Sequence, residues 1–342
     1  RFQVRYAQER GTVPLAEMQA AQVSAYIQDE WQASDRLRIT GGLRIDVPLY
    51  FTDLGFNQGF ATNFGDARGL NTNNLPNSNP LYTARAGLNY DVLGDTRLRL
   101  RFSSGLFAGR PPFVWLSNNA SNTGLLFGEV IAQRGTGPAL QATDGLQFTP
   151  NQPQPGIPAP GDPVGTQEIN VVDPNFRFPQ VWRTTLGLDY KLTENLTATV
   201  EGMYSKDVWA VYHQNLNIRP ETVRSSLPDG RDAVANGVAA GTGAVGRTVD
   251  GRFTNIILLT NTNLGYQYTL KFQLNQQFNN GLAWNLAYVY TRAEDATSSP
   301  SSVAFTAWSG NLVAGHPNRP VLRTSNYELR HRVVGGLTYR FE

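Results

Sequence analysis

Arginine is the residue of this chain with the most evident binding chemistry. The chain has 29 Lys and Arg residues, and only Lys191, Lys206 and Lys271 among them are lysines. Arginines that share a face, such as Arg99 and Arg101, could contact a substrate or a domain that lies against this face. The candidate residues of this polar face are Arg85, Arg99, Arg101, Arg183 and Glu201. The simpler interpretation is that the arginines pair with carboxylates of the same face, such as Glu201 and Asp189.

A second candidate site lies in the long segment 110–180, which holds 11 of the chain's 20 prolines. Loops of this length usually carry a function or are disordered. Trp115 precedes three asparagines, Asn118, Asn119 and Asn122, and this set suits the rim of a ligand site on a loop that a rigid scaffold holds in place. Packing of one loop against another explains the same four residues equally well.

Other site chemistries are not supported. The chain has no cysteine, which excludes disulfides and thiolate metal sites. His213, His316 and His331 lack the spacing of a zinc motif, and we expect them at the surface. No Ser/His/Asp set or carboxylate pair stands out. We therefore expect no catalytic residue, no metal, no cofactor and no enzymatic activity.

Two further features argue against a nucleotide or nucleic-acid partner. The sequence GTGAVG at 241–246 matches the dinucleotide fingerprint, but it has neither a preceding strand nor a following helix, and we expect a flexible loop there. The net charge is only +2, whereas a nucleic-acid-binding protein would show a basic stripe.

The elements that position these residues are alternating strands, most clearly within residues 181–206. Trp182, Leu186, Leu188 and Tyr190 share one apolar face, and the intervening residues are mainly polar. The pattern resumes after a short turn at 193–195. Each of the two strands that this turn would join has about the 9–11 residues that a tilted strand needs to cross a bilayer. Trp182 and Tyr190 are separated by about 26 Å along a strand. If the strand is tilted in the bilayer, their separation across the membrane is close to the spacing between the two aromatic girdles of a membrane β-barrel.

The same alternation recurs along the whole chain and predicts ten strands, the first at residues 1–8. Short connections at 33–35, 93–95, 193–195 and 279–281 alternate with long ones. No apolar run is long enough for a membrane-spanning helix. The arginines fall on the polar face, where they avoid the cost of about 2–4 kcal/mol for a lipid-facing arginine. A soluble β-sandwich gives no reason for aromatic residues at both ends of the apolar stripes, so we favour an all-β, antiparallel transmembrane β-barrel.

Several short motifs follow one another within residues 21–125. They are YIQDEW at 26–31, RLRI at 36–39, GLRID at 42–46, ARAG at 84–87, GLF at 105–107, GRPPF at 109–113, SNN at 117–119 and NTG at 122–124. In order and spacing these motifs resemble the TonB-dependent outer-membrane receptors, in particular their Oar-like β-barrel domain. Beyond these residues the chain matches the family by architecture rather than by motif.

The resemblance implies a 22-stranded barrel in the outer membrane of a Gram-negative bacterium, in contact with membrane lipid. It also implies a plug domain inside the barrel and energy transfer from a TonB complex. About ten strands with long extracellular loops, and no plug or TonB box, predict that residues 1–342 are a single partial barrel domain. A complete ten-stranded barrel is the less favoured alternative. On this resemblance, the polar face that carries the arginines would face the lumen.

Two functions follow from this interpretation. The first is a receptor that binds an unidentified ligand at its extracellular loops and imports it through the plugged lumen. The second is a structural or docking protein of the outer membrane that displays its loops to partners without active transport. A plug with a TonB box in the full-length protein would favour the first.

Overall fold

A computed structural model describes most of the chain as one large sheet and a layer of packed loops. The described residues are 2–9, 13–65, 69–132, 167–219, 248–298, 301–311 and 316–341, with the short pieces 223–225, 232–234, 237–238 and 244–245. The four short pieces form the strands β10 (Val223–Ser225), β11 (Asp232–Val234), β12 (Gly237–Val238) and β13 (Ala244–Val245). They pair only with one another, β10 with β11 and β12 with β13.

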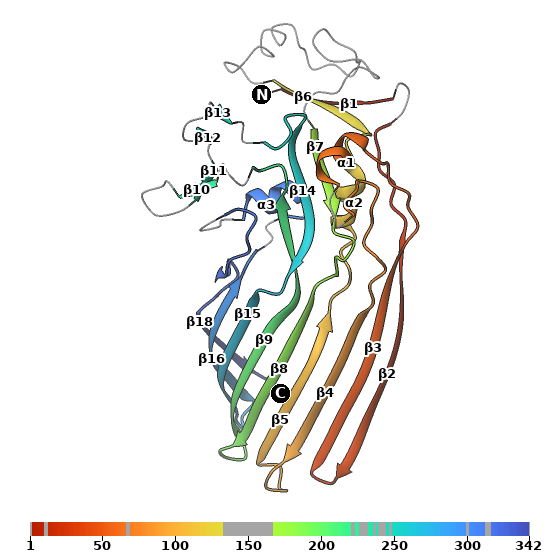
Figure 1. Cartoon of the computed structure of the whole chain (residues 1–342). Helices are drawn as coiled ribbons and strands as arrows, with labels where there is room; N and C mark the ends of the chain where they lie inside the picture. Colours follow the sequence, from red (N-terminus) through yellow and green to blue (C-terminus); the bar gives the residue numbers. More distant parts are fainter. Residues whose placement is uncertain are drawn as a thin grey trace.

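In the described part of the chain, nine long antiparallel strands form one curved wall (Figure 1). In order across the wall they are β2 (Ala20–Ser34), β3 (Leu37–Tyr50), β4 (Leu81–Asp91), β5 (Leu98–Ala108), β8 (Gln180–Lys191), β9 (Leu196–Asn215), β15 (Gly265–Gln277), β16 (Leu282–Asp295) and β18 (His331–Tyr339). Together with β7 (Gln167–Val172), β14 (Phe253–Thr262) and β17 (Arg323–Thr324), they make a sheet of 12 strands. The wall is not closed, because β2 and β18 lie at its two edges and do not pair with each other. The predicted all-β, antiparallel architecture is confirmed.

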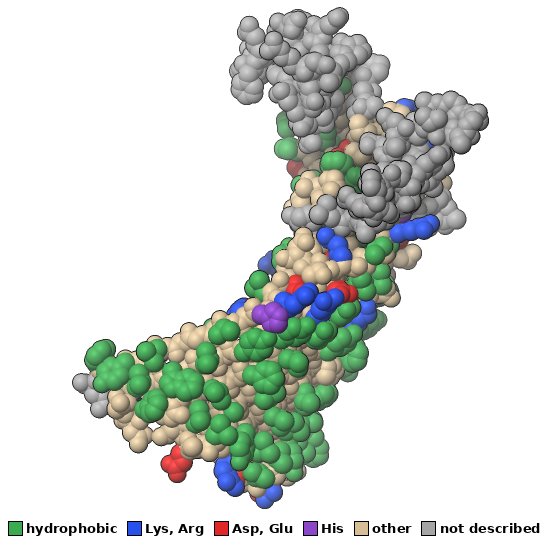
Figure 2. Space-filling view, turned by 90° about the vertical axis from the view of Figure 1, so that its left-hand side faces the viewer, with side chains coloured by type: hydrophobic (Ala, Val, Ile, Leu, Met, Phe, Trp, Pro, Cys, Tyr) green, Lys and Arg blue, Asp and Glu red, His purple; other side chains and the backbone are tan. Residues whose placement is uncertain are grey.

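The outer face of the wall is apolar. On β8, Trp182, Leu186, Leu188 and Tyr190 are each 42–51% exposed, while Gly187 between them is buried. Figure 2 shows the same on another part of the wall, where hydrophobic side chains form a broad band with charged residues above it. Apolar side chains exposed over so large an area suit lipid rather than water.

The short and long connections lie at opposite ends of the wall (Figure 1). The links between β2 and β3, β4 and β5, β8 and β9, and β15 and β16 are tight turns at one end. At the other end, the long connections carry three helices, α1 (Gln58–Phe64), α2 (Val114–Ser121) and α3 (Ala304–Ser309). This end-to-end asymmetry is the one that the sequence predicts.

The first strand is the exception to the predicted barrel. β1 (Phe2–Ala7) pairs antiparallel with β6 (Phe127–Ala132), so it lies in the loop layer and does not join the wall. The prediction that residues 1–8 begin the barrel is therefore wrong. Their weak alternation fits this outcome, since a strand outside the wall does not have to present one face to lipid.

The loop layer has a core of its own, built around the parallel pair β7 and β14. Both faces of this pair are buried. One face packs against α1 and the other toward α2, in the clusters Phe60, Phe64, Leu70, Ile169, Val171, Phe253, Ile256 and Leu258, and Leu81, Leu116, Val172, Phe176, Phe178, Val211 and Leu259. The upper part of β9 also pairs with β14, at residues 210–215, and this pairing fixes the layer to the wall.

None of the helices in the described residues is long and apolar enough to cross a membrane.

Candidate functional site

A network of ion pairs on the inner face of the wall is centred on Arg101. Its Nε donates to Asp189 Oδ2 at 2.7 Å, and its Nη2 lies 3.2 Å from Glu201 Oε2. Lys271 Nζ lies 3.3 Å from the other oxygen of Glu201, and Thr199 donates to Asp189 at 2.7 Å. These contacts join four neighbouring strands, β5, β8, β9 and β15.

The register of the strands explains the network. Arg101, Gly187, Glu201 and Lys271 occupy one row across the wall. A Cβ atom at Gly187 would lie 3.0 Å from Arg101 Nη2, so the glycine lets the arginine reach Glu201 two strands away. Arg101 is 40% exposed in this structure, and each such pair contributes about 0.2–1 kcal/mol. The cations of this row are matched by acids of the wall itself.

The other predicted arginines of the inner face are not paired in this way. Arg85 on β4 donates to the side-chain oxygen of Gln28 on β2. Arg99 lies nearer the turns and lines a hollow of about 480 Å³ with Asp91 and Asp189. Arg183 on β8 is exposed. Among the described residues, none of these three arginines hydrogen-bonds to or forms an ion pair with a carboxylate.

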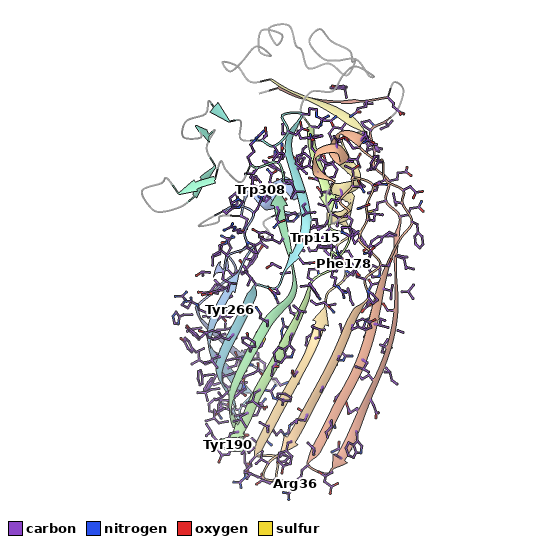
Figure 3. The ribbon with its side chains drawn as sticks, in the orientation of Figure 1. Arg36, Trp115, Phe178, Tyr190, Tyr266 and Trp308 are labelled. Atoms are coloured by element: carbon purple, nitrogen blue, oxygen red, sulfur yellow. The ribbon has the colours of Figure 1, made fainter. Side chains whose placement is uncertain are left out.

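The second predicted group, Trp115 and the three asparagines, lies on α2 and just beyond it. Trp115 is half-buried and packs against the core that contains Leu116 and Phe178, as Figure 3 shows for Trp115 and Phe178. Asn118 Nδ2 donates to the carbonyls of Val114 and Ser302, both at 2.9 Å, and so ties α2 to the segment before α3.

Asn119 and Asn122 differ from each other in their surroundings. Asn122 Nδ2 donates to the carbonyl of Asn118 at 3.0 Å, and the Asn122 carbonyl accepts from the backbone N–H of Asn170 at 2.9 Å. Asn119 is 1% exposed, and neither of its side-chain polar atoms has a hydrogen-bond partner within the part of the chain that the structure describes. The group thus serves contacts between loops, and ligand binding by Trp115, Asn118, Asn119 and Asn122 stays a prediction.

The residues that hold the loop layer together were not singled out from the sequence. Asn217 is 1% exposed, donates to the carbonyls of Asp250 and Phe253, and accepts from the backbone N–H of Asp250. Hydrogen bonds from Arg252 lower the pKa of Asp250 to about 2, and Asn63 on α1 donates to the same carboxylate at 2.7 Å. The turn sequence Asp250-Gly251 was the available signal, but it does not reveal a partner 33 residues away.

Comparison of the sequence with known protein families shows to which family the chain belongs. The sequence pattern of the outer membrane beta barrel domain matches residues 3–341. The chain belongs to the outer membrane beta barrel domain family. This membership confirms the predicted barrel fold and places the chain in the outer membrane of a Gram-negative bacterium. Assignment to the Oar-like branch stays a prediction.

Solved structures with a similar fold include three transporters. The outer membrane transporter YddB from Escherichia coli is 11% identical, with 94% of this chain and 31% of that chain covered and a TM-score of 0.47. The FrpB iron transporter from Neisseria meningitidis (F5-1 variant) is 10% identical, with 81% and 27% covered and a TM-score of 0.39. The copper transporter OprC is 12% identical, with 80% and 29% covered and a TM-score of 0.39. This chain spans less than a third of the length of each. No curated protein sequence matches it significantly.

Membership of an outer-membrane family predicts which end of the wall faces the medium. Outer-membrane barrels have short periplasmic turns and long extracellular loops. Residues 1–342 contain no cysteine, so a label found within this segment reports the single introduced cysteine. In intact cells that express the full-length protein, we expect an impermeant maleimide to label Gly251→Cys in the loop layer and not Glu194→Cys in a tight turn. Both should be labelled after the outer membrane is permeabilised. Labelling of Glu194→Cys alone in intact cells would reverse the topology.

Proposed function

We propose that this chain is part of the barrel wall of a TonB-dependent outer-membrane receptor. Its loop layer binds a substrate at the cell surface, and the substrate enters through a lumen that a plug domain of the full-length protein fills. The outer face contacts membrane lipid, and the TonB complex supplies the energy for uptake. In this proposal the chain has no catalytic role and needs no cofactor.

The inner face of the wall is the observation that carries this proposal. It presents Arg85, Arg99, Arg101, Arg183 and Lys271, together with Asp189 and Glu201, instead of an apolar core. A wall of this kind suits a lumen that holds water, a polar plug or a passing polar solute. The loop layer adds a packed surface at the extracellular end, where binding residues are expected on a rigid scaffold.

The test compares uptake by the native bacterium with uptake by two deletion strains. One strain lacks the gene for the full-length protein and the other lacks TonB. Depletion of small molecules from a defined rich medium is followed by mass spectrometry. We expect at least one compound to remain in the medium in both deletion strains and to be consumed again after complementation with the wild-type gene.

The docking function predicts a different result from the same strains. If this protein only displays its loops, its deletion leaves the depletion of every compound unchanged and instead weakens adhesion to a surface or to another cell. That outcome would overturn the transport proposal.

A further inference from the structure

A second row of the inner face has two arginines and no acid. The row runs across neighbouring strands through Gly42 on β3, Arg85 on β4, Gly105 on β5 and Arg183 on β8. Because paired residues of neighbouring strands point to the same side of a sheet, both arginines lie on the inner face. Arg85 and Arg183 are two strands apart, and the only residue between them has no side chain.

Gly105 keeps the space between the two arginines open, and Gly42 leaves room for Arg85 on the β3 side. A Cβ atom at Gly105 would lie 2.8 Å from the Ala84 carbonyl oxygen and 3.0 Å from Arg85 Cβ. At Gly42, it would lie 3.3 Å from Arg85 Nε. Two strand spacings separate the Cα atoms of Arg85 and Arg183 by about 10 Å. Half of this distance is within the reach of an extended arginine, so both guanidiniums can meet one anion above Gly105 when the Arg85 side chain turns from Gln28 on β2 toward β5.

Neither arginine has a counter-charge among the described residues. Arg85 donates to the neutral amide oxygen of Gln28. The nearby Asp46 is already engaged by Arg44, at 2.7 Å, and by the side chains of Gln22 and Ser24. In the row of Arg101, acids of the same wall balance the cations. In the row of Arg85 and Arg183 the wall supplies no acid, so an anion from elsewhere would have to balance the two charges.

Open space and aromatic side chains lie beside Arg85. A hollow of about 460 Å³ is lined by Tyr26, Arg44, Asp46, Thr83, Arg85 and Phe107. A second hollow, of about 370 Å³, lies on the other side of Arg85 and also reaches Phe107. Tyr26 is 73% exposed and Phe107 is 38% exposed, so both can contact a ligand. Cavities of this size, with apolar walls and a few polar groups, suit small molecules.

We propose that this row is a binding site for a small organic anion. The carboxylate or phosphate group of the ligand lies above Gly105 between the guanidiniums of Arg85 and Arg183, and its apolar body contacts Tyr26 and Phe107. Planar guanidiniums suit both oxyanions, because each offers two parallel N–H donors. This inference rests on the proposed function, since it names the class of solute that the lumen would pass.

The experiment measures binding of phenyl phosphate to the purified full-length protein in detergent by isothermal titration calorimetry. We expect the wild-type protein to bind it and Arg85→Gln/Arg183→Gln to bind at least about tenfold more weakly, because two charge-assisted contacts are lost. Phenol, which has the ring without the charge, should not bind measurably. Phe107→Ala should weaken binding of phenyl phosphate more than binding of inorganic phosphate.

The matched control is Arg38→Gln, which removes another arginine of the inner face. Arg38 lies 3.3 Å from Glu30, so it already has a counter-charge, and its loss should leave the affinity unchanged within about twofold. If Arg85→Gln/Arg183→Gln does not assemble, Arg85→Lys/Arg183→Lys keeps both charges, and we expect it to bind about fivefold more weakly because the forked geometry is lost.

Two outcomes would overturn the site: no binding of phenyl phosphate by the wild-type protein, or equal weakening by Arg38→Gln and the double variant. The measurement needs no TonB complex and no uptake. A failure of the uptake experiment would therefore leave a positive binding result standing, and a failure of binding would leave the proposed uptake to its own test.

Discussion

Replacing Leu186 by arginine should sharply reduce the amount of folded protein in the outer membrane. Leu186 lies midway between Trp182 and Tyr190 on the outer face of β8 and is 51% exposed in this structure. Its partners across the sheet, Phe102 and Gly202, offer no counter-charge. An arginine at this depth would face lipid at a cost of about 2–4 kcal/mol, a large part of the stability of an ordinary domain.

The neighbouring residue provides the control for this substitution. Thr185 is half-buried on the inner face of the same strand, opposite Ser103 and Met203, so Thr185→Arg places the same charge toward water. Folded full-length protein is measured in outer-membrane fractions by heat-modifiable gel mobility and protease resistance. We expect near-normal amounts for Thr185→Arg and a strong loss for Leu186→Arg. Equal loss from both would show that the two faces are not lipid and lumen.

The long strands of the wall could be predicted from the sequence because their pattern is local. One face of each strand meets lipid and the other meets the lumen, so polarity changes at every residue. The predicted strand that begins at residue 181 corresponds to β8 (Gln180–Lys191), and the short turn at 193–195 joins it to β9. These features depend only on neighbouring residues.

The loop layer could not be predicted in the same way. β14 is buried on both faces, so the run from Ile256 to Leu259 is continuously apolar and has no period of two. Its parallel partner β7 lies more than 80 residues earlier in the chain, and the partner of β1 lies more than 100 residues later. Pairings over such distances leave no pattern within a short window of sequence.

For the arginines of the inner face, too, the sequence predicts one part and not the other. Alternation assigns Arg85, Arg101 and Arg183 to one face of the sheet, and the sequence goes no further. Whether an arginine meets an acid depends on the register between strands, which places Glu201 within reach of Arg101 but Gly105 between Arg85 and Arg183. The glycines matter as much as the charged residues, since they decide which side chains can converge.

His213 corrects a further expectation from the sequence. The sequence predicts a surface position for it, but it is 6% exposed on the upper part of β9, beyond the residues that pair within the membrane-spanning wall. Its register partner is the buried Leu259 of β14. Removal from water disfavours the charged imidazole and lowers the pKa of His213 from 6.5 to about 4.

Acidification should therefore loosen the attachment of β14 to β9. Between pH 6.5 and about 4, the separated strands bind a proton at His213 that the paired strands do not, so stability of the pairing falls as the pH is lowered. The loss amounts to about 2 kcal/mol at pH 5 and about 3 kcal/mol below pH 4, and it is absent above pH 7. A raised pKa of His213 would instead make the pairing more stable as the pH is lowered.

The measurement is hydrogen exchange of peptides from β14, corrected for the pH dependence of intrinsic exchange. On going from pH 7.5 to pH 5, we expect protection in the wild-type protein to fall roughly 30-fold more than in His213→Leu, which has nothing to protonate at this position. His331→Gln is the control, because His331 is exposed on β18 and its replacement should leave the wild-type response unchanged. If His213→Leu responds to acid as strongly as the wild type, another group governs the attachment. Burial of His213 would then have no part in the acid response.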